Sequence, residues 1–194
     1  MYSSGHYGTA MILYAPVVFV LMYLQLYPLA ALASIIIVGG TRIPDWDLRI
    51  PVVQHRGITH TFLFVAFFGL LIGTALAGGV LYGYEKLPEP FLLFGSGEVT
   101  GVTVVIAALF GFACGALSII AHLLADFITP MGLQPLHPFS DARYSAQIVK
   151  AKNPVANALL FTSGMIAVIV AAAAGIYLSG VLPGTEQAVF SLPF

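Results

Sequence analysis

The chain has 194 residues, of which 59% are hydrophobic and 8% are charged, whereas an ordinary soluble domain has about 45–50% and about 25%. This composition excludes a soluble globular domain and indicates a membrane protein. The formal net charge of -1 provides no basic field for nucleic acid, so we expect no nucleic-acid partner. The single cysteine, Cys114, excludes an internal disulfide and a Cys-x-x-Cys motif.

Apolar segments long enough to cross a bilayer recur five times. A hydrocarbon core of about 30 Å needs about 20 apolar residues in a helix. The sequence therefore predicts an all-α integral membrane protein with about five transmembrane helices, folded as a single helical membrane domain over residues 1–194. The predicted spans are Thr9 to Tyr27, Leu29 to Ile43, Ile58 to Tyr82, Val99 to Ile128 and Val155 to Leu178.

Pro28 predicts a reversal of the chain between the first two spans, because proline breaks a helix interior and suits a first turn. The alternative is one kinked helix from Thr9 to Ile43, which would leave His6 and Asp45 on opposite sides of the membrane. The distribution of basic residues favours the reversal. With five spans, six basic residues lie on the N-terminal side and only Lys86 lies on the other, and the positive-inside rule places the larger set in the cytoplasm. The six are Arg42, Arg49, Arg56, Arg143, Lys150 and Lys152.

All five histidines and all four aspartates fall on or near this predicted cytoplasmic side. At the end of the fourth span, His122 and Asp126 are four residues apart and share one helical face, so they can bind one metal ion or each other. Ser118 and Cys114 continue the same stripe inward, and Ser118 is a candidate hydrogen-bond partner for a ligand. The alternative is a pair that satisfies only itself, but ionisable residues within a span indicate function.

The segment Pro44-Asp45-Trp46-Asp47 follows the second span. Proline ends the helix, and a turn at the membrane interface then presents two carboxylates that suit a metal ion. Residues two apart point in opposite directions in an extended chain, so we expect one aspartate to be a ligand and the other to support it. The alternatives are a solvated helix end for the aspartates and an interfacial anchor for Trp46.

The segment His55-Arg56-Gly57-Ile58-Thr59-His60-Thr61 opens the third span. Its glycine allows a sharp turn, and Thr59 is the expected helix cap. We expect His60 to face the bundle interior near His122. The planar fork of Arg56 suits a phosphate or a carboxylate. The alternative for Arg56 is a topology anchor at the lipid headgroups.

Two further histidines give weaker signals. His6 precedes the first predicted span, and His137 lies in a proline-rich loop after the fourth. Either is a candidate ligand or an ordinary loop histidine. The Gly39-Gly40 pair and the alanines from 171 to 174 indicate close helix packing.

These segments resemble a known family. The Asp45-x-Asp47 pair after a proline, HRGITH at His55 to His60, HLLADF at His122 to Phe127, and Pro138-Phe139-Ser140 look like the YdjM-like family of membrane-bound metal-dependent hydrolases. The similarity runs from His6 to about Ser140. The resemblance implies an integral membrane helical protein with hydrolase activity.

A more distant resemblance concerns the order of the ligands. The zinc-dependent phospholipase C and single-strand nuclease enzymes place a His, an Asp, a His and then His-x-x-x-Asp on a helical scaffold. This resemblance implies the metal ligands His6, Asp45, His60, His122 and Asp126. The chain lacks a second downstream His-x-x-x-Asp or His-x-x-x-Glu motif, so we expect one or two ions rather than three.

Together these patterns predict a multi-pass hydrolase in the plasma or inner membrane with a cytoplasm-facing site, acting on a phosphoester of a lipid or of a small phosphorylated molecule. Mixed imidazole and carboxylate ligands suit Zn²⁺, with Mn²⁺ or Mg²⁺ as alternatives. Asp47, His55 and Arg56 are the candidate catalytic residues. Asp47 or His55 would act as general base or support a ligand, and Arg56 would hold the anionic group.

Two other functions compete with the hydrolase. A non-catalytic membrane scaffold whose histidines bind a structural metal is compatible with the sequence. A transporter or proton channel fits less well, because it needs an ionisable residue in the far half of the membrane. The spans contain none between the predicted cytoplasmic cluster and Glu98.

Overall fold

The computed structural model describes residues 1–49, 56–86 and 100–180. Five segments within these ranges are long and apolar enough to cross a membrane, which confirms the predicted all-α membrane architecture. His55 and Glu98 lie outside the described residues. The helices are α1 (Ser3–Tyr23), α2 (Tyr27–Ser34), the π-helical turn η1 (Ile35–Gly39), the 3-10 turns η2 (Pro44–Arg49) and η3 (Ile58–His60), α3 (Phe62–Lys86), α4 (Gly101–Phe127) and α5 (Pro154–Leu178).

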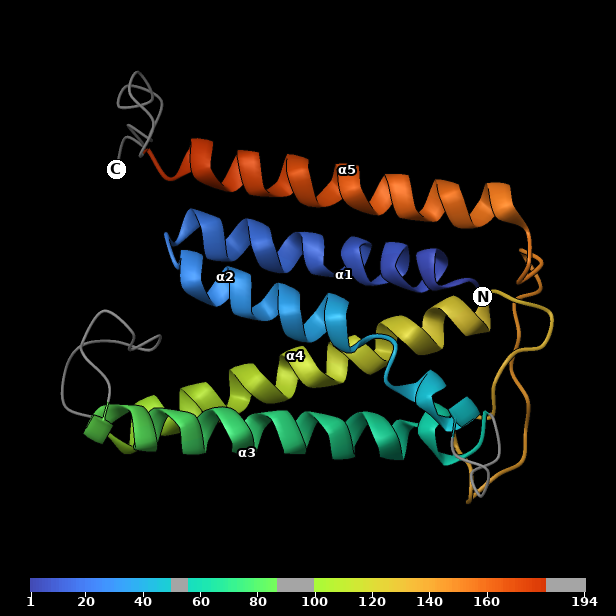
Figure 1. The fold of residues 1–194 in the computed structure, drawn as a ribbon, viewed down its shortest axis with the longest axis horizontal. Coiled ribbons are helices and arrows are strands. Elements are labelled where there is room, and N and C mark those ends of the chain that lie inside the picture. The colour runs from blue at the N-terminus through green and yellow to red at the C-terminus, as the bar shows by residue number, and fades with distance from the viewer. Residues whose placement is uncertain (50–55, 87–99, 181–194) are drawn as a thin grey trace, which may run out of the picture.

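The long helices lie side by side with their axes along the longest dimension of the molecule (Figure 1). α1 packs along α5, α3 packs along α4, and α1 also contacts α2 and α4. Successive helices run in opposite directions (Figure 1). The start of α1, the turns η2 and η3, and the end of α4 therefore meet at one end of the bundle, and this meeting positions the candidate site.

The predicted reversal between the first two spans is confirmed. α1 ends at Tyr23 and α2 begins at Tyr27, with Pro28 in its first turn. Gln25 has a φ of 59° in the connection, and the Leu26 amide donates a hydrogen bond to the Leu21 carbonyl at 2.8 Å. A single kinked helix from Thr9 to Ile43 is therefore wrong, because the chain turns back before Pro28.

Two helix starts differ from the prediction. α1 begins at Ser3 rather than Thr9, so His6 lies inside the helix and not before it; a hydropathy criterion misses this first turn because its residues are small or polar. The third span begins with a separate 3-10 turn, and its long helix starts at Phe62. Thr61, not Thr59, caps that helix, because the Phe64 amide donates to Thr61 Oγ1 at 3.2 Å.

Small residues let the helices approach closely. A Cβ atom added to Gly164 of α5 would lie 2.5 Å from the Gly8 carbonyl oxygen of α1, so the two backbones are in direct contact. Of the predicted glycine pair, only Gly40 packs closely: a Cβ there would lie 2.8 Å from Ser118 Oγ, whereas Gly39 has nothing within 4 Å. The predicted alanine packing is present in part, since Ala171 and Ala172 pack against the buried cluster formed by α1, α2 and α4.

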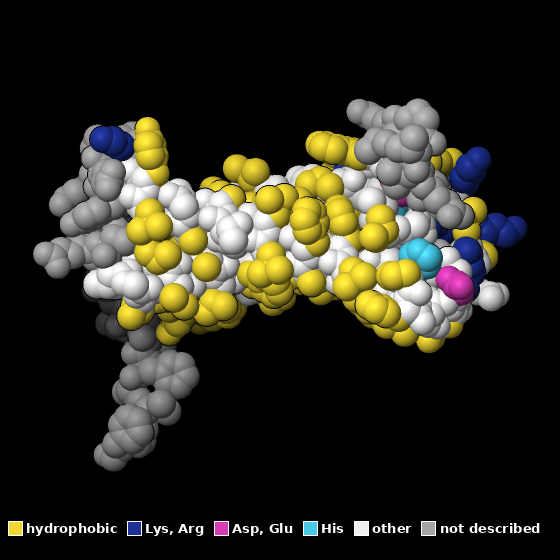
Figure 2. Space-filling model, turned by 90° about the horizontal axis from the view of Figure 1, so that it is seen from below, with side chains coloured by type: hydrophobic (Ala, Val, Ile, Leu, Met, Phe, Trp, Pro, Cys, Tyr) yellow, Lys and Arg dark blue, Asp and Glu magenta, His cyan; other side chains and the backbone are white. Residues whose placement is uncertain are grey.

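Hydrophobic side chains cover the length of the face drawn in Figure 2, and Lys and Arg side chains gather at one end of it. Large apolar residues are exposed on several helices, including Phe67 of α3 at 59%, Leu109 of α4 at 63% and Ile166 of α5 at 61%. This surface suits the interior of a bilayer. The basic side chains that the structure describes in the loops at the site end belong to Arg42, Arg56, Arg143, Lys150 and Lys152.

Candidate metal centre

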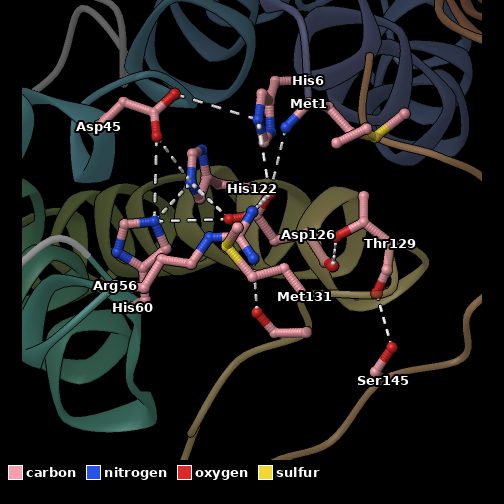
Figure 3. A network of polar contacts seen from close by, with 12 residues as sticks. Met1, His6, Asp45, Arg56, His60, His122, Asp126, Thr129, Met131 and Ser145 are labelled. Carbon is pink, nitrogen blue, oxygen red and sulfur yellow. Dashed lines mark hydrogen bonds and ion pairs between the residues drawn. The ribbon is translucent and has the colours of Figure 1, made fainter. Parts of the chain in front are cut away.

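The five predicted metal ligands converge at one end of the bundle (Figure 3). His6 comes from α1, Asp45 from η2, His60 from η3, and the remaining two from α4. Donor atoms of His60, His122 and Asp126 all lie within 4.8 Å of one another, as do donor atoms of His6, Asp45 and His122. This confirms the prediction that the third and fourth spans bring their polar ends together. The three histidines and Asp126 are at most 1% exposed.

The two carboxylates lie between the imidazoles. Asp45 places Oδ2 4.0 Å from His6 Nε2 and Oδ1 3.6 Å from His122 Nε2. Asp126 does the same on the other side, with Oδ1 3.9 Å from His6 Nε2 and Oδ2 3.7 Å from His122 Nε2. Each aspartate thus presents one oxygen to His6 and the other to His122. The predicted contact between His6 and Asp45 is confirmed.

The orientation of His122 is fixed from behind. Its Nδ1 lies 2.8 Å from the Thr41 carbonyl oxygen. Because a carbonyl only accepts hydrogen bonds, Nδ1 carries the proton and donates it. In the neutral ring, Nε2 then presents its lone pair to the cluster, which is the tautomer that a metal ligand needs. Thr41 directly follows the π-helical turn and Gly40, and π-helical turns are frequent at functional sites.

His60 is oriented in the same way by two side chains. Thr59 Oγ1 donates its hydrogen to Asp47 Oδ2 at 2.9 Å, so the same hydroxyl accepts from His60 Nδ1 at 3.0 Å. Asp47 Oδ2 also lies 3.4 Å from His60 Nδ1. Nδ1 is therefore the protonated nitrogen, and Nε2 of His60 is directed at the centre. A carboxylate behind a histidine is the usual support for a metal-binding imidazole.

The two directed nitrogens face each other. Nε2 of His60 lies 3.0 Å from Nε2 of His122. Two lone pairs at this distance repel unless a cation, either a shared proton or a metal ion, lies between them. Ligand atoms of a tetrahedral Zn²⁺ site lie about 3.3 Å apart for bonds of about 2.0–2.1 Å. The donor set and its spacing therefore fit a divalent metal.

Asp47 lies behind His60 rather than at the centre. It is 3% exposed, and its Oδ2 also accepts a hydrogen bond from the Arg56 amide at 3.1 Å. The Arg56 backbone has a φ of 60°, a left-handed conformation that is unusual for a residue with a side chain. The carboxylate thus holds both the imidazole of His60 and the strained turn that precedes it. Of the two aspartates in η2, Asp45 is the one whose oxygens reach the other candidate ligands.

Two arginines flank the carboxylates. Arg56 donates from Nη2 to Asp126 Oδ1 at 2.7 Å and from Nη1 to the Gly132 carbonyl at 2.7 Å. Arg42, which the sequence suggested only as a topology residue, has Nε 3.6 Å from Asp45 Oδ2 and donates from Nη1 to Ser3. The cluster is therefore bounded by positive charge on both sides.

Other predicted residues lie elsewhere. His137 is at the surface, where its Nδ1 lies 3.2 Å from Asp141 Oδ1, so it is an ordinary loop histidine rather than a member of the cluster. Ser118 is fully buried, and its Oγ has no hydrogen-bond partner among the described residues. Trp46 is 57% exposed.

Asn157 is a structural residue that the sequence analysis missed. It is 1% exposed, and its Oδ1 accepts a hydrogen bond from the Tyr2 amide at 3.1 Å. Its Nδ2 donates to the carbonyls of Ala151 and Asn153. The side chain therefore ties the start of α1, and with it His6, to α5. An amide in the first turn of an otherwise apolar span was the available signal.

The model of the family described as YdjM inner membrane protein matches residues 1–186, a range that includes all five candidate ligands and all five candidate spans. No curated protein and no solved structure matches the chain.

Proposed function

The chain belongs to the YdjM inner membrane protein family, and we propose that it is a membrane-embedded, metal-dependent hydrolase of phosphoesters. The observation that carries this proposal is the pair of Nε2 atoms, from His60 and His122, that face each other at 3.0 Å between two carboxylates. Such a buried arrangement of mixed donors is costly in a membrane protein and by default indicates function.

The proposed ligands are the five residues of the cluster, and the proposed cofactor is Zn²⁺, with Mn²⁺ or Mg²⁺ as alternatives. Two three-residue groups support a site for one or two ions, and His122 belongs to both. When bound, such an ion polarises a phosphoester oxygen and makes hydroxide available at neutral pH.

The residues around the ligands have separate proposed roles. Asp47 holds His60 in its metal-binding orientation, and Arg56 offers its guanidinium fork to the anionic group of the substrate. Arg42 adds a second positive charge beside Asp45. Asp45 has the most exposed side chain of the five ligands, 14% against 0–2%, so it is the most solvent-accessible of them. His55 is retained as a candidate general base or support for a ligand.

The site faces the cytoplasm in this proposal. The loops at its end of the bundle carry most of the basic residues, and the positive-inside rule places such loops in the cytoplasm. Lys86, at the end of α3, lies at the opposite end of the bundle.

A non-catalytic scaffold with a structural metal is the second candidate. The near-complete burial of four of the five ligands favours it, because closed sites are typical of structural metals. The exposure of Asp45 and the two flanking arginines favour the hydrolase. Turnover of a substrate by the metal-loaded protein would distinguish the hydrolase from the scaffold.

The test uses the protein purified in detergent and loaded with Zn²⁺ or Mn²⁺. Its metal content is measured by elemental analysis, and its activity is measured on a panel of phosphomonoesters, phosphodiesters and phospholipids. We expect the H122A variant to lose both metal and turnover, because the same residue serves both ligand groups. The H137A variant, which removes the surface histidine at the same end, is the matched control and should retain both. Full metal content with no turnover of any compound would favour the scaffold.

A further inference from the structure

A second feature at the site end of the molecule is an apolar cavity of about 350 Å³. This volume is within the range of small-molecule sites. The cavity is formed where the end of α4 meets the start of α3 and the loop that follows α4. Its lining side chains are apolar except for one phenol and come from Phe62, Ile120, Leu123, Leu124, Phe127, Leu133, Pro135, Leu136 and Tyr144.

The walls of the cavity are held by backbone hydrogen bonds. Leu133 and Tyr144 pair across the loop, with amide-to-carbonyl distances of 3.0 Å and 2.9 Å. The Phe62 amide donates to the Pro135 carbonyl at 2.9 Å, which fixes the loop against the start of α3. The cavity is therefore a built feature of the fold and not a gap between free side chains.

Two short segments connect this cavity to the metal centre. Phe62 lines the cavity and follows His60 by two residues. Leu133 also lines it and follows Gly132, whose carbonyl accepts the hydrogen bond from Arg56 Nη1 at 2.7 Å. The guanidinium of Arg56, which also donates to Asp126, and the apolar wall are thus adjacent through one peptide unit, so a single molecule with a charged head and an apolar tail could contact both.

The rim of the cavity is apolar and accessible. Leu124 is 40% exposed, Leu136 42% and Tyr144 46%. The cavity also lies at the ends of two candidate spans, Phe62–Gly83 and Gly101–Phe127, so acyl chains of a surrounding bilayer would lie beside it. A lining with almost no hydrogen-bonding groups offers nothing to a sugar or a nucleotide base, whereas it suits a hydrocarbon chain.

We propose that this cavity holds an acyl chain of the substrate, and that the substrate is a lipid phosphoester whose headgroup reaches Arg56 and the His/Asp cluster. This inference rests on the proposed function and narrows it, because a small water-soluble phosphoester would leave the cavity unused. The size of the cavity limits the length of the acyl chain and fixes its position, and Arg56 fixes the position of the phosphate.

The first test measures binding without hydrolysis. Protein in detergent micelles is labelled with a phosphatidylcholine that carries a photoactivatable diazirine near the end of one acyl chain, and the labelled peptides are mapped. We expect labelling of residues 120–136 that excess unlabelled long-chain phospholipid displaces. The L124W variant, which fills the cavity, should reduce this displaceable labelling by about tenfold because the chain loses its apolar contacts.

Two further variants keep the labelling result interpretable. L136W fills the same cavity from the loop, so it replaces L124W if the helix substitution perturbs folding. L159W is the matched control, since Leu159 is a 63% exposed leucine on α5 outside the cavity, and its labelling pattern should equal that of the wild type. Displaceable labelling that is unchanged in both cavity variants, or labelling that excess lipid never displaces, would overturn the inference.

The second test compares substrates. In L124W, kcat/KM for a long-chain phospholipid should fall by about tenfold, while kcat/KM for a short-chain, water-soluble analogue stays unchanged, because only binding of the tail is lost. Equal losses on both substrates would overturn the inference while leaving the hydrolase intact. Displaceable labelling in a protein that hydrolyses nothing would support the lipid site and contradict the proposed function, so the two failures are distinguishable.

Discussion

The imidazole rings of His6 and His122 are stacked, with centroids 4.1 Å apart and planes inclined by 4°. The two rings come from α1 and α4, and both direct Nε2 to the same pair of carboxylates. They differ in how they are held. Nδ1 of His122 donates to a carbonyl, whereas Nδ1 of His6 is buried without a hydrogen-bond partner among the described residues. The position of His6 therefore depends on the packing of α1.

This difference predicts unequal effects of removing the two rings. H122A should lose all bound metal, because His122 is common to both candidate ligand groups. H6A should keep metal with reduced stoichiometry or affinity, because His60, His122 and Asp126 still form a complete group. Elemental analysis after dialysis against defined free Zn²⁺ measures the outcome. Metal content that is lost to the same extent in both variants would contradict this description of the cluster.

A second prediction concerns the support of His60. In D47N the side chain keeps its shape but loses its negative charge, so the imidazole is a weaker and less well-oriented ligand. We expect metal affinity to fall by about 10–100-fold, as for other carboxylates behind metal-binding histidines. A competition titration with a zinc chelator gives the affinity, and D141N, at the exposed partner of His137, is the control. Wild-type affinity in D47N would show that Asp47 has no part in the site.

A third prediction distinguishes a metal ligand from a residue that binds the anionic group of the substrate. R56K should leave the metal content intact and weaken turnover of an anionic substrate, because a point charge cannot reproduce the bidentate fork. The control is R143K, since Arg143 lies in the loop after α4 and, among the described residues, donates to the Met131 carbonyl at 3.0 Å. Loss of metal in R56K would instead mean that the contact with Asp126 is needed to hold that ligand.

A fourth prediction tests helix packing at a distance from the chemistry. G164A should lower both the Tm and the metal affinity, because the added Cβ would lie 2.5 Å from the Gly8 carbonyl oxygen and push α1, with His6, away from α5. G78A is the control, since a Cβ there meets nothing within 4 Å. Thermal unfolding in detergent with and without Zn²⁺ provides both readouts. Equal behaviour of the two variants would show that the α1 and α5 contact does not govern His6.

The sequence predicted the main features of the fold and the cluster because strong physical signals carry them. Hydropathy located the spans, Pro28 located the reversal, and the four-residue spacing of His122 and Asp126 placed both on one face. Because the spans alternate in direction, the starts of the first and third spans lie at the same end of the bundle as the ends of the second and fourth. The convergence of His6 and Asp45 follows from this topology.

The details that orient the ligands were not predictable in the same way. The acceptor for His122 is the backbone carbonyl of Thr41. Every residue has such a carbonyl, so the amino-acid sequence does not indicate which one accepts this hydrogen bond. Threonine favours helix caps, which predicts Thr59 as the cap, yet the Thr59 hydroxyl contacts Asp47 and His60 while Thr61 caps the helix. Two threonines two residues apart offer the same local signal, and only the tertiary contact with Asp47 separates them. Arg42 was missed because a single arginine after a span also serves as a topology signal.

The backbone contact between Gly8 and Gly164 gives α5 a structural role in the site, although this helix supplies no candidate ligand. α5 contributes neither an imidazole nor a carboxylate to the centre. It nevertheless fixes the position of α1 through that contact, and it holds the start of α1 through Asn157. Four of the five ligands come from the segment between Asp45 and Asp126, so a chain that stopped before Pro154 would keep those four and release the fifth. The position of His6 thus depends on the fifth span, which begins 148 residues later in the sequence.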